Sequence, residues 1–279
     1  MRVNPPVQKP STFRLLQIVA SLIAHRELIW AMTKREIVGR YRGSIMGVAW
    51  SFFHPILMLA VYTFVFSVAF KARWAGGSDS KTEFALILFT GMIIHGLFAE
   101  CVSRAPGLIL GNVNYVKKVI FPLEVLPCIA LGAALFHTTI SIGVLLTFYV
   151  IINHSLQWTV IFLPLVIAPL IIFTLGVSWF LASLGVFLRD TGQIIGVVLT
   201  IMMFVSPVFF PVSALPEKYQ IFIMLNPLTF IMEQARDVVI WGKLPNWFGL
   251  MIYTIASLVV ATLGFAWFQN TRKGFADVL

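Results

Sequence analysis

The sequence has few charged residues. Its 279 residues include 20 Lys and Arg and 11 Asp and Glu, so that 11% carry a charge, whereas a soluble globular protein carries about 25%. Hydrophobic residues make up 59% of the chain, and the mean hydropathy is +0.93. This scarcity of charge excludes an ordinary soluble enzyme and a disordered chain, and it predicts that lipid surrounds much of the protein.

The sequence also lacks the short motifs of nucleotide, acyl-transfer and zinc chemistry. It contains no G-x-x-x-x-G-K-[ST] loop, G-x-G-x-x-G turn, G-x-S-x-G elbow or H-E-x-x-H helix, and no Cys/His cluster with metal-ligand spacing. Cys101 and Cys128 lie in apolar stretches and are interpreted as small hydrophobic residues. We therefore expect no metal and no cofactor on this chain, and any ATP-driven work needs a second polypeptide.

Five uncharged stretches approach or exceed the roughly 20 residues that a membrane-crossing helix needs. They cover 43–70, 84–99, 125–188, 191–216 and 244–271, and polar residues at 153–157 divide the third into two. We therefore predict an all-α integral membrane protein with six transmembrane helices. The second helix is expected to extend through Glu100, whose carboxylate would reach the interface and pair with Arg104.

Lys and Arg are unevenly distributed among the predicted loops. One side of the membrane holds 14 of them and the other side 6, which places both termini in the cytoplasm. Because these residues lie between apolar runs, they form no basic face that would bind nucleic acid. Residues 1–42 are predicted to form a cytoplasmic and interfacial segment, in which apolar residues within 15–23 recur at helical spacing, as in an amphipathic helix on the membrane surface. Residues 43–279 are predicted to form the six-span domain.

A sixth uncharged stretch, 219–232, is too short to cross the membrane and contains Asn226-Pro227. We predict short re-entrant helices here, between the fifth and sixth spans, because irregular backbone at membrane depth must be buried in protein or line a cavity. A small cap outside the membrane fits the composition equally well.

Ionisable residues inside the spans are few. No span has a carboxylate at its centre, while His54, His95 and His137 lie inside the first three. A neutral imidazole that hydrogen bonds across helices is the favoured role, with a proton shuttle as the alternative. This pattern weakens the case for an ion-coupled carrier.

Aromatic residues are abundant, at 14% of the chain with 25 Phe. At 100° per residue, the aromatic side chains of the first span fall into two clusters on different sides of the helix. A row of rings suits a passage for sugars, because flat rings cover the apolar faces of sugars, although packing against lipid or helices explains any single ring. The first cluster comprises Phe52, Tyr62, Phe66 and Phe70, and the second comprises Trp50, Phe53 and Phe64.

The loop 103–125 is too polar to cross the membrane and too long for a tight turn. We predict a short helix near 111–118 with Asn112 as its N-cap, which would offer a contact to a soluble partner. A basic connector held to lipid headgroups is the alternative. Arg189-Asp190 form the other inner turn, between the fourth and fifth spans.

Several short motifs are spread along the chain. They are K-R-E-I-V-G-R-Y-R-G-S-I-M-G-V-A-W at 34–50, H-P at 54–55, Y-T-F-V-F at 62–66, F-L-R-D-T-G-Q at 187–193, S-P-V-F-F-P at 206–211, P-E-K-Y at 216–219 and L-N-P-L at 225–228. Together these motifs resemble the membrane subunits of ABC transporters that export polysaccharides such as O-antigen, capsule or teichoic acid. The R-Y-R-G-S form at 40–44 is more similar to the O-antigen and teichoic acid branches than to the capsule branch.

The resemblance implies a homodimer around a central channel in the bacterial inner membrane. Two copies of an ATP-binding cassette subunit, which hold the ATP and Mg²⁺, would dock on the cytoplasmic side, and this chain would itself have no enzymatic activity. The substrate would be a lipid-linked polysaccharide, with O-antigen as the first candidate. An interfacial helix is implied at about 29–42, a coupling helix at 111–118 and an outer gate at 214–236.

The resemblance and the charge pattern together assign residues to four regions. The basic Arg40 and Arg42 are expected to attract the diphosphate of the lipid carrier. The residues expected to line the substrate channel are Phe52, Tyr62, Phe66, Phe70, Phe204, Phe209 and Phe210. Those expected to couple to the ATPase are Asn112, Val113, Asn114, Tyr115, Lys117, Arg189 and Asp190. Arg40, Tyr41 and Arg42 are expected at the cytoplasmic mouth, and Tyr219, Asn226, Pro227, Glu233 and Arg236 at the outer gate.

Two other functions stay open. A polytopic acyl or glycosyl transferase would show clustered polar residues at one membrane face, and Glu233, Arg236 and Asp237 form such a group. Glu233 and Arg236 are expected to form a structural salt bridge, because they lie three residues apart on a helix. A proton-coupled carrier would transport without any ATPase and would depend on His137.

Overall fold

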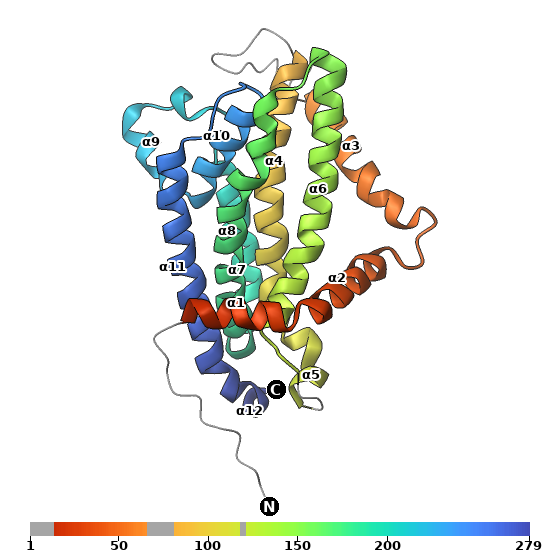
Figure 1. The fold of residues 1–279 in the computed structure, drawn as a ribbon, viewed down its shortest axis with the longest axis vertical. Helices are drawn as coiled ribbons and strands as arrows, with labels where there is room; N and C mark the ends of the chain where they lie inside the picture. The colour runs from red at the N-terminus through yellow and green to blue at the C-terminus, as the bar shows by residue number, and fades with distance from the viewer. Residues whose placement is uncertain (1–13, 66–80, 118–120) are drawn as a thin grey trace, which may run out of the picture.

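The computed structural model describes residues 14–65, 81–117 and 121–279. These residues fold almost entirely into helices, and no strand occurs among them. Most of the long helices stand side by side in one bundle, and α1 lies across one end of it (Figure 1). The α-helices are α1 (Arg14–Ala24), α2 (Arg26–Tyr41), α3 (Trp50–Tyr62), α4 (Lys81–Arg104), α5 (Val113–Lys117), α6 (Val125–Asn153), α7 (Leu163–Phe187), α8 (Thr191–Val205), α9 (Glu217–Met224), α10 (Pro227–Val239), α11 (Trp247–Thr271) and α12 (Phe275–Val278). The 3-10 helices are η1 (Gly47–Ala49), η3 (Ala105–Gly107), η4 (Leu110–Asn112), η5 (Trp158–Phe162), η6 (Val212–Ala214) and η7 (Arg272–Gly274).

The predicted all-α membrane architecture is confirmed. The described part of the chain contains five helical segments that are long and apolar enough to cross a membrane, and α8 is a shorter apolar helix of 15 residues. α8 ends at Val205, earlier than the uncharged run 191–216, because Pro207 lacks an N–H and restricts the residue before it. The first span begins at Gly47, later than the start of the uncharged run 43–70. Gly43 and Gly47 both have positive φ angles (85° and 52°), which favour glycine.

α4 is the central helix of the bundle. In the segment that contains α4, 78% of the apolar stretch is buried, whereas in the segment that contains α3 only 17% of it is buried. α4 contacts α3, α6, α7, α8 and α10. Figure 1 shows α3 leaning away from the bundle, with its first residues farthest from α6. The core therefore surrounds α4, and α3 lies at the margin.

α7 and α11 form the closest helix pair. Near their first residues the rings of Phe162 and Trp247 are 5.5 Å apart, and near their last residues the hydroxyls of Ser183 and Thr271 are 2.6 Å apart. The two helices therefore run side by side in the same direction. A Cβ at Gly264 would lie 2.1 Å from the carbonyl oxygen of Gly176, so the glycines permit a backbone approach that no other residue allows.

The two ends of the bundle differ. α1, α2, α5 and α12 lie at one end and α9 and α10 at the other, and these are called the α2 end and the α10 end (Figure 1). The first and last described helices thus lie at the same end, as expected for an even number of spans. That this end faces the cytoplasm stays a prediction, as does the division of the chain at residue 42, which falls between α2 and η1.

Candidate functional site

A fully buried arginine holds the α10 end together. Arg236 of α10 has an exposed fraction of 0%, and its Nη1 donates to Glu233 Oε1 at 2.8 Å, which confirms the predicted salt bridge. Its Nε donates to the carbonyl of Ile87 on α4 at 3.1 Å, and its Nη2 donates to the carbonyl of Val208 at 3.3 Å. Gly91 leaves room for this guanidinium, because a Cβ there would lie 2.6 Å from Nη2. One side chain therefore joins α4, α10 and the non-helical segment after α8.

α10 is a buried helix with a well-defined start. Asn226 is its N-cap, since its Oδ1 accepts from the backbone N–H of Leu228 at 3.0 Å, and Pro227 occupies the first helical position. The Asn226 amide also donates to Ser206 Oγ at 2.7 Å, which fixes the end of α8. α10 packs against α4, α7 and η5, and its re-entrant placement in the membrane stays a prediction.

The other predicted gate residue lies apart. Tyr219 is on α9, where it is exposed, and the ammonium of Lys218 lies 4.8 Å from the centre of its ring. Four of the five predicted outer-gate residues are thus on or at the start of α10, and the fifth is on the exposed helix beside it. Their role as a gate stays a prediction.

A polar cluster joins three helices toward the α2 end. This α2 cluster consists of Arg40 and Tyr41 on α2, Glu100 on α4 and His137 on α6. Arg40 Nη1 lies 2.7 Å from Glu100 Oε1, His137 Nδ1 lies 3.1 Å from both Glu100 oxygens, and the Tyr41 hydroxyl lies 3.1 Å from His137 Nε2. A neutral imidazole fits the contacts with Glu100 and Tyr41 if Nδ1–H donates to Glu100 and Nε2 accepts from Tyr41. Arg40 Nη1, which also lies 3.1 Å from Nδ1, then donates to Glu100. Burial raises the pKa of Tyr41, so its hydroxyl stays protonated and can donate.

The predicted pair between Glu100 and Arg104 is wrong. Glu100 faces α2 and α6, and Arg104 pairs with Glu36 of α2, because α2 lies close enough to supply a partner to each. Arg40 and Tyr41, which were expected to line a cytoplasmic mouth, are bonded within the chain, and Arg42 is exposed. Their role at a mouth stays a prediction.

The predicted interhelical histidine bonds are found for two of the three residues. His137 contacts α2 and α4, and His95 Nε2 lies 3.3 Å from the carbonyl of Leu199 on α8. His54 is exposed on α3. Two histidines therefore connect helices.

The predicted coupling helix exists but is short. Asn112 precedes α5, and its Nδ2 donates to the Leu108 carbonyl at 2.8 Å behind it, while its role as the N-cap stays a prediction. The Tyr115 hydroxyl accepts from Arg35 Nη2 at 3.0 Å, which raises the pKa of Arg35 and links α5 to α2. The Tyr115 ring stacks on Phe121 with centres 4.4 Å apart. The predicted residues on α5 are Val113, Asn114, Tyr115 and Lys117.

Arg189 and Asp190 lie where they were expected, in an exposed turn between α7 and α8. This turn is near the α2 end, because Gly185 of α7 lies against Pro106, two residues beyond the last residue of α4. The two predicted coupling regions therefore lie at the same end of the bundle.

The predicted channel residues separate into two groups. On α3, Phe52 is 51% exposed and Tyr62 is half-buried against the core. Around the end of α8, Phe204 is 59% exposed, and its ring centre lies 5.8 Å from that of Phe209. Phe210 is half-buried in the same segment, whereas Phe66 and Phe70 lie outside the described residues. Their role in lining a channel stays a prediction.

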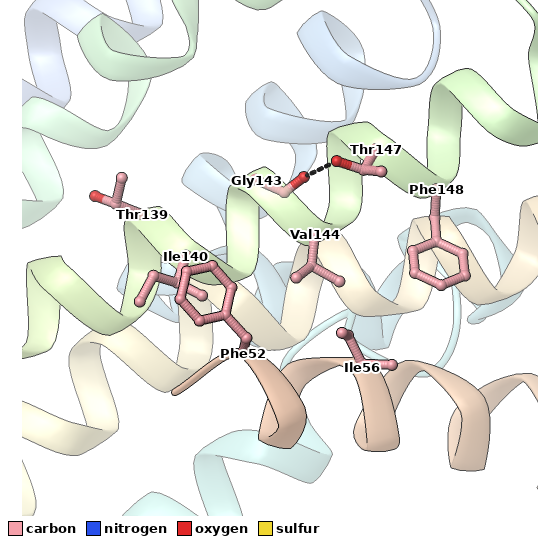
Figure 2. A pocket seen from close by; sticks show the side chains of 8 residues that line it. All are labelled: Phe52, Ile56, Thr139, Ile140, Gly143, Val144, Thr147 and Phe148. Atoms are coloured by element: carbon pink, nitrogen blue, oxygen red, sulfur yellow. Dashed lines mark hydrogen bonds between the residues drawn. The ribbon is translucent and has the colours of Figure 1, made fainter. Parts of the chain in front are cut away.

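A groove of about 510 Å³ lies between α3 and α6. Figure 2 shows Ile140, Val144 and Phe148 of α6 on the side facing Phe52 and Ile56 of α3. The hydroxyls of the two lining threonines already donate to carbonyls of their own helix at 2.8 Å. The walls are therefore apolar. The lining residues are Phe52, Ile56, Thr139, Ile140, Gly143, Val144, Thr147 and Phe148.

Sequence reasoning gave no role to Glu124, which joins several elements at the α2 end. Its carboxylate accepts from Ser21 of α1 at 3.3 Å and from Arg272 at 3.0 Å, and its carbonyl accepts from Trp179 Nε1 of α7 at 2.9 Å. An acidic residue next to a long apolar run was the available signal. Among the described residues, no three His, Cys, Asp or Glu side chains lie close enough together to hold a metal ion.

Comparison with known proteins places this architecture in a family. The ABC-2 type transporter model matches residues 27–240. The chain is 26% identical to the O-antigen export system permease protein RfbA of Myxococcus xanthus, over 94% of this chain and 99% of that protein. It is 24% identical to the polysialic acid transport protein KpsM of Escherichia coli, over 87% of this chain and 93% of that protein. It is also 24% identical to the capsule polysaccharide export inner-membrane protein CtrC of Neisseria meningitidis serogroup B, over 91% of this chain and 94% of that protein. The family match spans most of the chain, including α10 and the α2 cluster, and so the protein belongs to the ABC-2 type transporter family, as a membrane permease subunit whose ATPase is a separate polypeptide.

Proposed function

We propose that this chain is the membrane-channel subunit of an ATP-driven exporter that moves a lipid-linked polysaccharide, O-antigen as the first candidate, across the bacterial inner membrane. The observation that carries the proposal is the match to the O-antigen permease RfbA over 94% of this chain and 99% of that protein. The R-Y-R-G-S motif at 40–44 supports O-antigen over capsular polysaccharide. The similarity to KpsM and CtrC makes capsular polysaccharide the second candidate.

The chemistry of the cargo explains why a protein-lined route is needed. A sugar carries several hydroxyl groups, and stranding each one in hydrocarbon costs roughly 2–7 kcal/mol. A chain of many sugars therefore cannot cross lipid unaided. Exposed rings such as Phe52 and Phe204 suit a sliding polymer, because they cover the apolar faces of sugars without holding any one sugar tightly.

The exposed face of α8 supports a homodimer around the route. Ile194, Val197, Ile201 and Phe204 are all more than half exposed along this short helix. Such a row of large apolar side chains suits contact with a second copy or with the channel between two copies. We place α3 and α8 of both copies around the channel.

The α2 end is the side on which the ATPase acts in this proposal. Two ATP-binding cassette subunits, holding ATP and Mg²⁺, would contact α5 and the exposed turn at Arg189-Asp190. The excess of basic residues in the loops of this side supports its placement in the cytoplasm. The hydrogen bond between Arg35 and Tyr115 then connects the docking region to α2.

The test is transport by purified components in vesicles. Permease and ATPase together should move lipid-linked O-antigen in an ATP-dependent manner, while an ATPase that lacks its Walker lysine should not support movement. A capsular polymer on its own lipid serves as the competing substrate. Uphill movement by the permease alone, or sugar or acyl transfer by it, would overturn the proposal.

A further inference from the structure

We propose that the groove between α3 and α6 holds the hydrocarbon chain of the phosphate-headed lipid to which the cargo is linked. This inference rests on the proposed export of a lipid-linked polymer. It assigns the lipid end of the cargo to a groove that shares Phe52 of α3 with the proposed sugar route. Four observations carry it: the walls of the groove, its cross-section, its position along α6 and the charges at one of its ends.

The walls suit hydrocarbon. The lining side chains from both helices are aliphatic or aromatic, apart from two threonines whose hydroxyls are bonded to their own helix. A hydrocarbon chain therefore loses no hydrogen bond on entering and strands no polar group of the protein. The volume of about 510 Å³ lies in the range of small-ligand sites.

The cross-section suits a single chain. From Thr139 to Phe148 the groove rises about 14 Å along α6, at about 1.5 Å per residue. The space free of protein atoms is about 850 Å³, which over this length gives a cross-section of at most about 61 Å², below the roughly 80 Å² of a helix about 10 Å across. A helix from a second copy of the protein therefore cannot lie fully within the groove, whereas one hydrocarbon chain fits.

The position suits one leaflet of the bilayer. The groove begins two residues after His137, whose partners Arg40 and Glu100 are charged and therefore mark the interface and not the hydrocarbon. Its length of about 14 Å is close to half of the ~30 Å hydrocarbon thickness. With the α2 end in the cytoplasm, the groove spans the inner leaflet, where the lipid-linked polymer would arrive.

The charges at the interfacial end suit a phosphate. Arg40 and Arg42 are both at the end of α2, and Glu100 is bonded to Arg40, so the basic charge exceeds the acidic charge there. The Arg42 side chain has no hydrogen bond or ion pair with other described residues, and it is exposed. Guanidinium groups bind phosphate by paired hydrogen bonds, so Arg42 is the residue placed to receive it.

The test uses photocrosslinking in nanodiscs with the permease bound to its ATPase. The probe is a polyprenyl phosphate with a diazirine in its chain, and the comparison lipid is phosphatidylglycerol with the same diazirine. The blocking variant is Gly143→Leu, since Gly143 lines the groove and an added Cβ meets nothing within 4 Å. The matched control is Gly96→Leu on α4, another exposed helical glycine with open space around it.

Wild type should crosslink the polyprenyl phosphate to peptides that contain Phe52 or Ile140. Gly143→Leu should lower this labelling at least fivefold, Gly96→Leu should leave it within twofold, and Arg42→Gln should weaken the binding of the probe at least threefold. Equal labelling of the groove by phosphatidylglycerol, crosslinks there to a second copy of the protein, or labelling that Gly143→Leu leaves unchanged would overturn the inference.

A transport assay separates this inference from the proposed function. If ATP-dependent export proceeds and the groove is not labelled, the lipid site is wrong and the exporter stands. If export fails for wild type while the groove is labelled, the chain binds a phosphate-headed lipid and the proposed function is wrong. Gel filtration of each variant as the intact complex shows that the substituted proteins are folded.

Discussion

Replacing the buried arginine of α10 by methionine should destabilise the α10 end. Methionine in place of Arg236 keeps much of the side-chain length but removes the donors to Ile87, Val208 and Glu233. The Ile87 carbonyl lies inside α4, where the helix itself supplies a donor to it, so the loss of the bond from Arg236 costs little free energy there. The Val208 carbonyl lies between helices and loses the bond from Arg236.

The magnitude follows from these three partners. A buried carbonyl left without a donor costs about 1–3 kcal/mol, and an ion pair to a carboxylate that is 38% exposed contributes at most about 1 kcal/mol. The free energy of unfolding should therefore fall by about 1–4 kcal/mol. For a chain of 279 residues the fall corresponds to a melting temperature roughly 2–7 °C lower, at about 2.1 cal/mol/K of unfolding entropy per residue.

The assay is the melting temperature of the purified complex in detergent, followed by the loss of its gel-filtration peak after heating. Arg26→Met, at an exposed position of α2, is the matched control and should melt within about 2 °C of wild type. Arg236→Lys should fall between the two, because an ammonium cannot reproduce the fork of the guanidinium. If Arg236→Met melts with wild type, the arginine does not hold the three segments together, and the reasoning fails.

Two further substitutions test the contacts that position the helices. Glu100→Gln removes the carboxylate that joins α2 to α4 and α6, so trypsin should cleave within α2 several-fold faster than in wild type. Glu27→Gln, at an exposed site, should leave the cleavage rate unchanged, and equal rates for both variants would mean that the α2 cluster does not hold α2. Gly264→Val forces a Cβ to within 2.1 Å of the Gly176 carbonyl, so α7 and α11 should separate and the yield of folded complex should fall at least fivefold. Gly96→Val is the control, and a normal yield of Gly264→Val would contradict the close approach.

The sequence predicts the membrane architecture well, because uncharged runs report directly on burial in lipid. The spans, the buried helix that begins at Asn226-Pro227 and the salt bridge between Glu233 and Arg236 follow from run length, proline chemistry and helical spacing. Each of these signals is local. Interactions between neighbours on one helix are therefore the part of the site that sequence reasoning recovers.

Contacts between distant segments are not recovered in this way. Helical spacing favours pairs four residues apart, and so predicts that Glu100 pairs with Arg104. In the structure α2 supplies Arg40 to Glu100 and Glu36 to Arg104. The error arises because a partner brought near by the packing of α2 competes with the local one.

α4 connects the two ends of the bundle through these distant contacts. Near the α10 end its backbone carbonyl at Ile87 accepts from Arg236, and near the α2 end its Glu100 and Arg104 pair with α2. Two ion pairs therefore join α2 to α4, and one buried guanidinium joins α4 to α10. Among the spans that the structure describes, α4 is the most deeply buried, although it neither lines the groove nor carries a residue assigned to the channel, the mouth, the coupling region or the gate.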